Sequence, residues 1–467
     1  MVSLVSELDV PVKPVLPVLV NTELLKRECA RARLVPLIVT STKPDFYKQW
    51  PLLPAAGKAG LPRVVMNTGQ HFDSLLGHGL DEFGIRENIG IDLRIKGNLS
   101  EKTSEVVAKL GVVSSFLSKE FPDNIFLPIV HGDTHAAGMV PLGWMFATNQ
   151  MAAQNEAGLR AMQPDFANRK NLRKFVNDQF ERKNWVLNRT EPFPEQYDTF
   201  IGGAACHYHF APTELNKDNL VREGYFEGRV PVVGNSVVEA LREKMGKKPE
   251  CSIFGEYPRL EKGDWIRVDV HRRENMIGDR FKAIFGGIRR LVRSGRNVVF
   301  VEMNANKFAV EQAGLETELE KLKGCKNFLY TPLWREYGQV VEFLKSDFCV
   351  AELTDSGSMQ EELNELKGPV CLTCRFSTDR PESVFSSGSN LLVPPISAEY
   401  VADLTEHILS SDSLVARMRK GRRLYGRFPS RKIMSFLKKR LDEVPFEWAN
   451  ERAGVSYRNS GGGRYFL

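Results

Sequence analysis

Cysteine is scarce in this sequence, and its few residues are not arranged for a metal site or a disulfide framework. The chain has 7 cysteines, widely scattered, in 467 residues, and only Cys371 and Cys374 form a CxxC pair. No second CxxC or histidine pair follows at zinc-site spacing. The pair lies in the apolar run "GPVCLTC", which favours two packed thiols over redox or metal chemistry. We therefore expect no metal and a reducing, cytoplasmic location.

Long apolar runs and a strong excess of charge are also missing. No stretch reaches ~18 uninterrupted apolar residues, the length that a membrane-spanning helix needs. The apolar start of the chain carries Glu7, Asp9 and three prolines without a basic segment, so it predicts neither a signal peptide nor a membrane span. The net charge of +6 suits anionic small molecules but is too small to indicate a nucleic-acid partner. The sequence predicts a soluble protein.

What the sequence does contain is a regular alternation of β-rich runs and helical patterns. This alternation predicts βαβ units with parallel sheets, and the continuous apolar strands predict sheets covered on both faces. The expected strands are residues 35–41, 63–68, 125–132, 265–270, 297–303, 347–353 and 369–374. The expected helices are residues 103–119, 236–246, 281–294, 309–323 and 398–410.

The length of the chain favours at least two domains. We expect an N-terminal extension (1–30), a Rossmann-like domain (31–234), a second Rossmann-like domain (235–425), and a C-terminal helix and flexible tail (426–467) that returns towards the first domain. Residues 163–190 look like an insertion in the first domain.

The insertion carries apolar residues at helical spacing on a basic background, namely Leu172, Phe175, Val176 and Phe180. Two interpretations stay open. The segment is either a surface helix docked by one apolar face, or a lid or oligomer contact.

Unusual polar residues follow the strands directly. They are Ser41 and Thr42, Gly132 to Thr134, His271 to Arg273, and Asp355 to Gly357. Ligands bind outside the carboxyl ends of the strands in open α/β sheets. Two such sheets facing each other would place all four groups around one central cleft.

Several acids and one histidine near these strand ends are candidates for acid–base chemistry. Asp133 serves either as a helix cap or in a site. Glu156 either forms a surface pair with Arg160 or acts chemically. Glu195 lies in the rigid loop "EPFPEQY". His271 precedes two arginines, which we expect to lower its proton affinity and prepare it to meet phosphate.

Basic and small residues nearby are candidates for binding an anion. Arg380, in a stiff Asp-Arg-Pro turn, is able to contact two phosphate oxygens at once. Lys43 and Lys48 follow the first strand, although each suits an ordinary solvated charge equally well. Ser356 to Ser358 offer hydroxyl and backbone N–H groups at the start of an expected helix, where an anion binds well.

Taken in order, the motifs resemble those of the non-hydrolysing UDP-N-acetylglucosamine 2-epimerases. The strings that carry the resemblance span roughly residues 35–425. They are "STKPDFYK", "NTGQHFD", "VHGDT", "NEAGLR", "PFPEQ", "YHFAPTELNKDNL", "VGNSVVEAL", "VHRREN", "LTDSGSMQEEL" and "STDRPE".

The resemblance implies a glycosyltransferase-B-like fold, with the nucleotide sugar between two domains and no cofactor. It implies epimerisation at C2 of UDP-GlcNAc to UDP-ManNAc, by anti elimination of UDP through a 2-acetamidoglucal and re-addition. By motif position, the catalytic residues would be Asp133, Glu156, Glu195 and His271. The substrate-binding residues would be Lys43, Lys48, Arg160, Arg272, Ser356, Gly357, Ser358, Glu362 and Arg380. Gln70 and His71 match positions that help to bind a second, activating nucleotide sugar.

Within the same motif, Glu362 would accept hydrogen bonds from the ribose, while Glu361 is expected to face solvent or to cap the turn. The resemblance also implies a homodimer and a role in polysaccharide biosynthesis. Three other functions stay open: a hydrolysing epimerase that releases ManNAc and UDP, a glycosyltransferase of the same fold, and a non-catalytic nucleotide-sugar sensor.

The chain departs from the family pattern at several positions, most of them on the sugar and regulatory side. Lys43 stands where the family usually has arginine, and Gln154 stands where it has histidine. Asp198 and Thr199 replace an Asn-Arg pair. Glu302 replaces a histidine, and Val340 replaces an aromatic residue that often stacks on uracil. These changes leave open which sugar is bound and whether the substrate also activates the enzyme.

Overall fold

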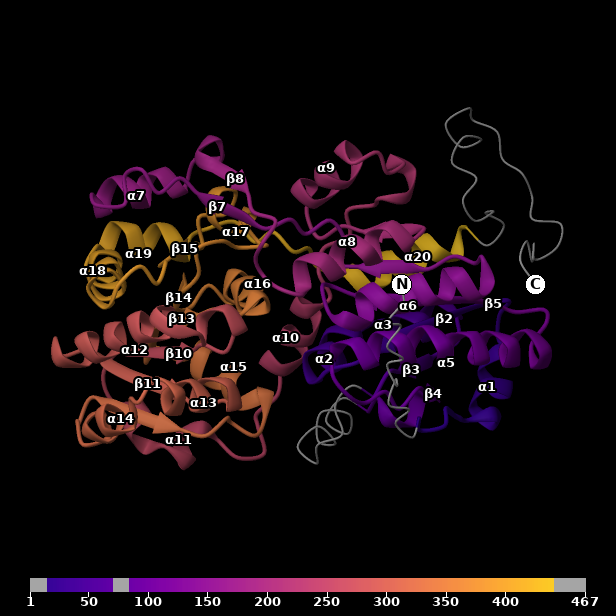
Figure 1. Cartoon of the computed structure of the whole chain (residues 1–467), viewed down its shortest axis with the longest axis horizontal. Helices are drawn as coiled ribbons and strands as arrows, with labels where there is room; N and C mark the ends of the chain where they lie inside the picture. Colours follow the sequence, from indigo (N-terminus) through magenta and orange to yellow (C-terminus); the bar gives the residue numbers. More distant parts are fainter. Residues whose placement is uncertain (1–14, 70–83, 441–467) are drawn as a thin grey trace, which may run out of the picture.

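Two mainly parallel β-sheets, lying side by side and flanked by helices, form the framework of the chain (Figure 1). The computed structural model describes residues 15–69 and 84–440, with residues 43 and 44 described only in their backbone. The first sheet has the order β1-β4-β3-β2-β5-β6-β9, and the second has the order β12-β11-β10-β13-β14-β15. The predicted α/β fold with two Rossmann-like sheets is confirmed.

The strands of the first sheet are β1 (Leu19–Val20), β2 (Leu34–Thr40), β3 (Val64–Asn67), β4 (Ile89–Asp92), β5 (Ile125–His131), β6 (Ala153–Asn155) and β9 (Tyr208–Phe210). Those of the second are β10 (Trp265–Asp269), β11 (Asn297–Val301), β12 (Phe328–Thr331), β13 (Cys349–Thr354), β14 (Val370–Thr373) and β15 (Asn390–Leu392). All pairings in both sheets are parallel except β1 with β4.

The helices of the first half are α1 (Thr22–Cys29), α2 (Lys43–Gln49), α3 (Leu52–Ala59), α5 (Leu99–Glu120), α6 (His135–Thr148), α7 (Leu172–Gln179), α8 (Glu195–Ala205) and α9 (Glu214–Arg222). Those of the second half are α10 (Val237–Met245), α11 (Ile253–Glu256), α12 (Gly278–Arg293), α13 (Asn304–Gln312), α14 (Glu316–Lys323), α15 (Tyr337–Lys345), α16 (Gly357–Leu366), α17 (Glu382–Phe385), α18 (Ala398–Leu409), α19 (Asp412–Arg419) and α20 (Pro429–Lys438).

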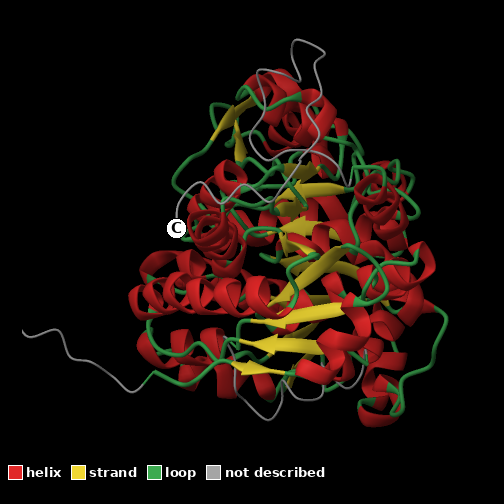
Figure 2. Cartoon of the chain, turned by 90° about the vertical axis from the view of Figure 1, so that its right-hand side faces the viewer, coloured by secondary structure: helices red, strands yellow, loops and turns green. Residues whose placement is uncertain are grey.

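Strand β2 shows why the apolar runs of the sequence became central strands. All of its residues are buried. Val35, Leu37 and Val39 pack into one core cluster, while Leu34 and Ile38 pack into another on the opposite face. Successive side chains of a strand point to opposite faces, so a continuous apolar run fits a sheet with helices on both sides. Figure 2 shows these two helical layers around the stacked strands.

Two expectations about segment boundaries are wrong. The N-terminal extension expected over residues 1–30 includes residues that belong to the first domain. β1 pairs with β4, and Leu25 of α1 is buried in the core of the first sheet. The single helix expected over residues 309–323 is two helices, α13 and α14. The chain turns between them at Gly314, whose φ of +66° favours glycine.

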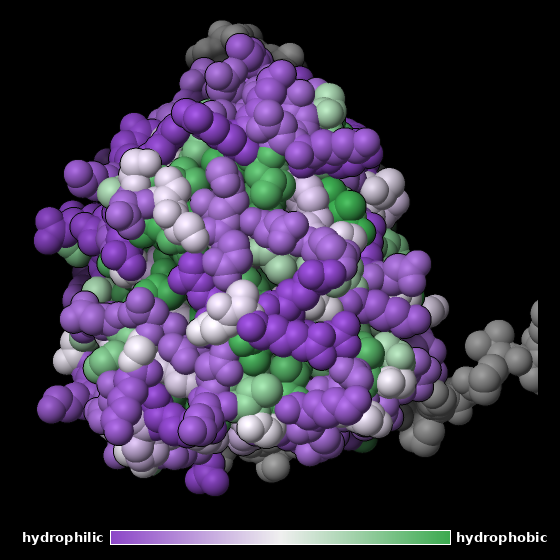
Figure 3. Space-filling view, turned by 90° about the vertical axis from the view of Figure 1, so that its left-hand side faces the viewer, coloured by the Kyte–Doolittle hydropathy of each residue, from purple (hydrophilic) through white to green (hydrophobic). Residues whose placement is uncertain are grey.

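The segment expected to be an insertion in the first domain packs on the second. It contains a two-stranded sheet of β7 (Met162–Pro164) and β8 (Trp185–Leu187) with α7 between them in sequence. Phe175, Val176 and Trp185 are buried in the core cluster of the second sheet. The helix is docked by one apolar face, in agreement with the first of the two interpretations. The side of the second domain that points away from the first is mainly hydrophilic (Figure 3).

The chain returns to the first domain at its described C-terminal end. Ile433, Met434 and Leu437 of α20 are buried in the same core cluster as Leu52 of α3. The predicted segment 426–467 is described only as far as residue 440. The flexible tail predicted at its end lies outside the described residues. No helix in the described ranges combines the length and the apolar character needed to cross a membrane.

The packing of α20 gives a test of the domain arrangement. Ile433 is fully buried, so Ile433→Ala is expected to lower the free energy of unfolding by about 2–5 kcal/mol through lost burial and a residual cavity. Chemical denaturation measures the change. Lys432→Ala, on the exposed face of the same helix, is expected to change it by less than about 0.5 kcal/mol. Equal stability of both variants would contradict this packing.

Candidate active site between the two sheets

The carboxyl ends of strands from both sheets bring the acids and cations of the sequence motifs together. Asp133 follows β5 and Glu156 follows β6, both in the first domain. Gly132 and Glu156 have φ values of +64° and +63°. A side-chain carbon on Gly132 would lie 2.3 Å from Oε2 of Glu156, so only glycine permits this close approach.

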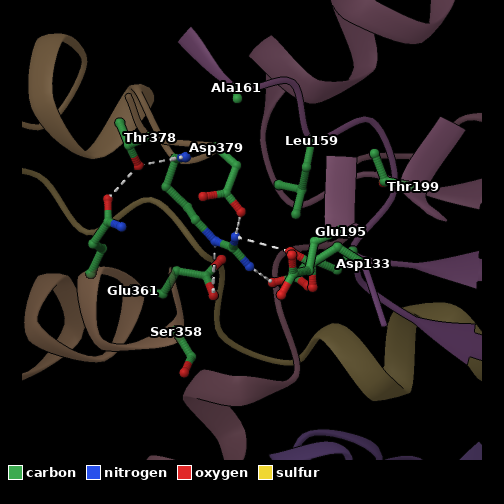
Figure 4. A network of polar contacts seen from close by, with 12 residues as sticks. Asp133, Leu159, Ala161, Glu195, Thr199, Ser358, Glu361, Thr378 and Asp379 are labelled. Carbon is green, nitrogen blue, oxygen red and sulfur yellow. Dashed lines mark hydrogen bonds and ion pairs between the residues drawn. The ribbon is translucent and has the colours of Figure 1, made fainter. Parts of the chain in front are cut away.

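Arg380 of the second domain lies at the centre of this group (Figure 4). Its guanidinium donates to Glu156 Oε1 at 2.7 Å and also contacts Asp379. Glu361 and Asp133 lie 3.8 and 3.9 Å from it. The side chain is only 1% exposed. One buried cation from the second domain therefore faces two acids of the first domain and two of its own.

A single amide joins two of these acids from the segment between the domains. Nδ2 of Asn235 donates to both Glu156 Oε1 and Glu361 Oε1, each at 2.7 Å. The Asn235 backbone N–H donates to the carbonyl of Tyr425, where the chain crosses back. Asn235 thus fixes the spacing of the Glu156 and Glu361 carboxyl groups at the junction between the domains.

The protonation states of these neighbours differ because their surroundings differ. Burial acts to raise the pKa of Glu156, but Arg380 and other nearby groups hold it below its ordinary value. Burial, reinforced by the charge of Glu156, raises the pKa of Glu361 well above its ordinary value. Burial lowers the pKa of His131 to about 4. The arrangement therefore favours an ionised Glu156 beside a protonated Glu361 and a neutral His131.

Glu195, the first residue of α8, receives a hydrogen bond from Arg272 Nη1 at 2.6 Å. Burial raises the pKa of Glu195 in spite of Arg272, and the nearby charge of Asp133 raises it further. Figure 4 draws the Glu195 and Asp133 carboxylates close to each other. Asp133 and Glu195 keep 14% and 26% of their side chains exposed, whereas Glu156 is fully buried. The first two are therefore open to a ligand.

His271 lies at the end of β10 and is held by carboxylates. Nδ1 of its ring lies 3.0 Å from Asp269 and 3.5 Å from Asp355. Burial acts to lower the pKa of His271, but Asp355 and Asp269 outweigh it and raise the pKa above its ordinary value. The expectation that adjacent arginines lower its proton affinity is wrong, because the effect of Arg272 is smaller than that of the carboxylates.

The first two turns of α16 combine small residues at the start with two buried acids, Glu361 and Glu362, in the second turn. Ser356 is the N-cap, and Gly357 and Ser358 begin the helix. A side-chain carbon on Gly357 would lie 2.6 Å from Arg380 Nη1. The expectation that Glu361 faces solvent or caps the turn is wrong, since it is fully buried against Asn235 and Arg380.

Glu362 belongs to a contact between the domains. It accepts a hydrogen bond from the Tyr337 hydroxyl at 2.6 Å. The Tyr337 ring stacks on Tyr47 of the first domain, with centroids 5.0 Å apart and planes within 10°. Burial raises the pKa of Glu362 to about 7, although the hydrogen bond from Tyr337 acts to lower it. Lys48 lies close enough to influence the pKa values of both Glu362 and Glu156.

One predicted site residue, Arg160, is not brought together with this group, and three others fall wholly or partly outside the described residues. Arg160 donates to Glu223 at 2.6 Å and stacks 4.0 Å over the Phe200 ring. It does not form the pair with Glu156 considered from the sequence, and its contact with substrate stays a prediction without support from this geometry. The side chain of Lys43 and all of Gln70 and His71 lie outside the described residues.

Residues that the motifs did not single out complete the site. Asn235 lies in the motif string "VGNSVVEAL", at the predicted boundary between the domains, but the string alone does not indicate a role in the site. His131 lies in the string "VHGDT" and Tyr337 lies outside all the motif strings, and nothing local distinguishes either from a core residue. Within residues 15–69 and 84–440, no cluster of three or more His, Cys, Asp or Glu is placed to hold a metal ion. Cys371 and Cys374 are buried free thiols whose pKa values burial raises.

Several departures from the family pattern lie near Gly132 in the first domain or at the carboxyl end of strand β11 in the second. Gln154 donates to the carbonyl of Gly132 at 3.0 Å and lies 3.4 Å from the Thr199 hydroxyl. Asp198 lies 3.4 Å from Nδ1 of His135. Glu302, after β11, pairs with Lys307 at 3.7 Å. These side chains contact other protein groups and do not add to the contacts of Arg380.

Together, the fold and site define a two-domain α/β protein with a charged reaction site between its sheets. The sequence profile of the family described as UDP-N-acetylglucosamine 2-epimerase matches residues 186–438. The chain belongs to this family, and the family predicted from the motifs is confirmed. The known members named below are epimerases, which are isomerases.

Named relatives cover most of the chain. The UDP-N-acetylglucosamine 2-epimerase of Salmonella borreze is 29% identical over 403 residues, covering 84% of this chain and 94% of that protein. The enzyme of the same name from Bacillus subtilis is 28% identical, with 84% and 92% covered. The Methanocaldococcus jannaschii UDP-GlcNAc 2-epimerase, solved with UDP-GlcNAc and UDP, has a TM-score of 0.68 at 26% identity, covering 87% of this chain and 99% of that one.

The raised pKa of Glu362 predicts a dependence of stability on pH. Between its ordinary value and about pH 7, the unfolded chain releases the proton while the folded chain keeps it, so rising pH removes stability. Glu362→Gln is expected to reduce this loss by on the order of 3 kcal/mol. Denaturant unfolding at pH 5 and pH 8 measures it.

The exposed Glu311→Gln serves as the control. It should show the same pH dependence as the parent protein, since its side chain faces solvent. A parent protein and Glu362→Gln variant with the same pH dependence would contradict the buried, protonated state of this carboxyl.

Proposed function

We propose that this protein epimerises a UDP-N-acetylhexosamine at C2, converting UDP-GlcNAc to UDP-ManNAc without a cofactor. The observation that carries the proposal is the set of acids from the first domain, Asp133, Glu156 and Glu195, facing the cations Arg272 and Arg380 of the second. Relatives named for this reaction, one of them solved with UDP-GlcNAc and UDP, support the substrate.

The reaction needs proton transfer on both faces of the sugar ring and stabilisation of a departing diphosphate. A carboxylate removes the C2 proton, the electron pair forms a C1–C2 double bond, and the C1–O bond breaks with its electrons leaving on UDP. A carboxylic acid then returns a proton to the opposite face of C2, and a UDP oxygen attacks C1. Atoms and oxidation states balance without a redox partner.

We assign the proton transfers to Asp133 and Glu195, because both remain partly exposed in the site. Glu156 is buried behind Arg380 and holds this cation in place. Its part in acid–base chemistry remains a prediction. The positive side chains of Arg272, His271 and Arg380, with the N-terminus of α16, would stabilise the charge on UDP as it leaves.

Incubation with UDP-GlcNAc in deuterated water tests the function. NMR should show deuterium at C2 and a new UDP-sugar. Asp133→Asn and Glu195→Gln are expected to lower kcat by about 10²–10⁴-fold, since each removes a proton-transfer group, while the Kd for UDP, by calorimetry, changes less than about threefold.

The exposed Asp123→Asn is the matched control and should react like the parent. Free ManNAc with UDP would instead identify a hydrolysing enzyme. A parent protein that incorporates no label and forms no new sugar would reject the proposal, and binding of UDP alone would then favour a sensor.

The raised pKa of His271 gives a second prediction. A protonated ring attracts the diphosphate, so the affinity of the parent protein for UDP should fall as pH rises through the pKa of His271. His271→Gln should bind UDP about three- to tenfold more weakly at pH 6 and should lose most of this pH dependence. Calorimetric titration from pH 6 to pH 9 measures both, and an unchanged pH profile would refute the role.

A further inference from the structure

The segment that joins two of the site's acids makes a long excursion onto the other domain. Glu156 lies before this segment and Glu195 lies after it, both in the first domain. Between them, residues 162–187 form β7, α7 and β8, here called the strap. Figure 1 shows the strap over the second domain, beside α18 and α19. Glu156 and Glu195 therefore flank a segment whose middle part packs on the second domain.

The middle of the strap is anchored on the second domain by apolar and polar contacts. Phe175 and Trp185 are buried in the core of the second sheet. Gln179 is fully buried and pairs with both backbone groups of Leu392, donating to its carbonyl at 3.1 Å and accepting from its N–H at 2.8 Å. Gln179 thus continues the hydrogen bonding at the edge strand β15. Arg417 of α19 stacks 3.6 Å over the Phe180 ring.

The incoming arm of the strap is bonded to the loop that carries Arg380. The N–H and carbonyl groups of Met162 pair with those of Thr378, both bonds at 2.8 Å. The Thr378 hydroxyl accepts from the Arg380 N–H at 3.0 Å and donates to Gln360 at 2.7 Å. Figure 4 shows Thr378 beside Asp379 at the edge of the charged group. A displacement of the strap would therefore act on the residue that pairs with Glu156.

The outgoing arm makes two ion pairs with the second domain before it reaches α8. Arg280 contacts Glu191 at 2.6 Å, and Arg272 contacts Glu195 at the same distance. On the first-domain side, Gln196 accepts a hydrogen bond from the N–H of Ala161 at 3.0 Å, which ties the two arms together. Glu156 and Glu195 are thus each connected in sequence to the strap, which is bonded to the second domain.

We propose that the strap positions two acids of the site, Glu195 and Glu156. Gln179 and Phe175 are positioning residues that hold Glu195 and the Arg380–Glu156 pair in place across the two domains. The proposal rests on the proposed function for its kinetic consequence but not for its structural one. Catalysis tolerates little misplacement of reacting groups, so loosening the anchor should slow turnover before it weakens the binding of UDP.

The test replaces Gln179 with methionine, which keeps an unbranched side chain of similar length but removes both bonds to Leu392. Gln179→Met is expected to lower kcat for epimerisation about tenfold, with KM and the Kd for UDP within about threefold of the parent. Amide hydrogen exchange measured by mass spectrometry should become faster in residues 156–162 and 376–382. Asn177→Met, exposed on the same helix, is the matched control and should behave like the parent.

Phe175→Leu is the second variant, since it retains an apolar side chain at the anchor and should show the same pattern more weakly. Unchanged kcat and unchanged exchange in Gln179→Met would overturn the proposal. A lowered kcat with unchanged exchange in those two segments would overturn it as well, because the acids would then not depend on the anchor. If the parent protein does not epimerise UDP-GlcNAc, the proposed function fails, while the exchange data still decide whether the strap fixes the site.

Discussion

The burial of the Arg380 guanidinium between two domains is the constraint on which the rest of the site depends. A buried charge is costly unless it is paired and hydrogen-bonded. Here the partners come from both sides: Asp379 and Glu361 from the second domain, Glu156 and Asp133 from the first. Asp379 pairs with the cation within the second domain, but its contacts with Glu156 and Asp133 exist only while the domains keep this arrangement, so the contacts that build the site also hold the domains together.

Within this group, the distribution of protons decides what the site is able to bind. Glu156 stays ionised against Arg380, while burial beside Glu156 keeps the proton on Glu361. His131 remains neutral, whereas His271, between two carboxylates, gains affinity for a proton. The first domain thus supplies acids to the site, while the second supplies the cations Arg272 and Arg380 together with acids such as Asp379. A sugar with a diphosphate leaving group fits such a site, because removal of the C2 proton needs a carboxylate, while the charge that leaves with the diphosphate from C1 needs a cation.

The sequence predicted the sheets well and the site in part. A continuous apolar run such as β2 predicts its position in the fold, since a strand that lies between two helical layers buries the side chains of both its faces. The positions of Asp133, Glu156 and Arg380 after strands follow from the same topology. The burial of Glu361 and the bridging amide of Asn235 were not predictable, because their partners lie far away in the chain. The raised pKa of His271 was predictable only in part, because Asp269 lies two residues away in the sequence but Asp355 approaches from another strand.

Two of the departures from the family pattern are neighbours in the structure. Gln154 and Thr199 replace a histidine and an arginine of the pattern, and in the structure their side chains lie 3.4 Å apart. Two changes that each remove a group able to carry positive charge therefore occur at one contact, beneath the Gly132 carbonyl that Gln154 binds. Among the described residues, Arg380 is the arginine or lysine that forms an ion pair with Glu156. The charge balance of the acids then depends on the domain contact, which is the contact that the strap secures.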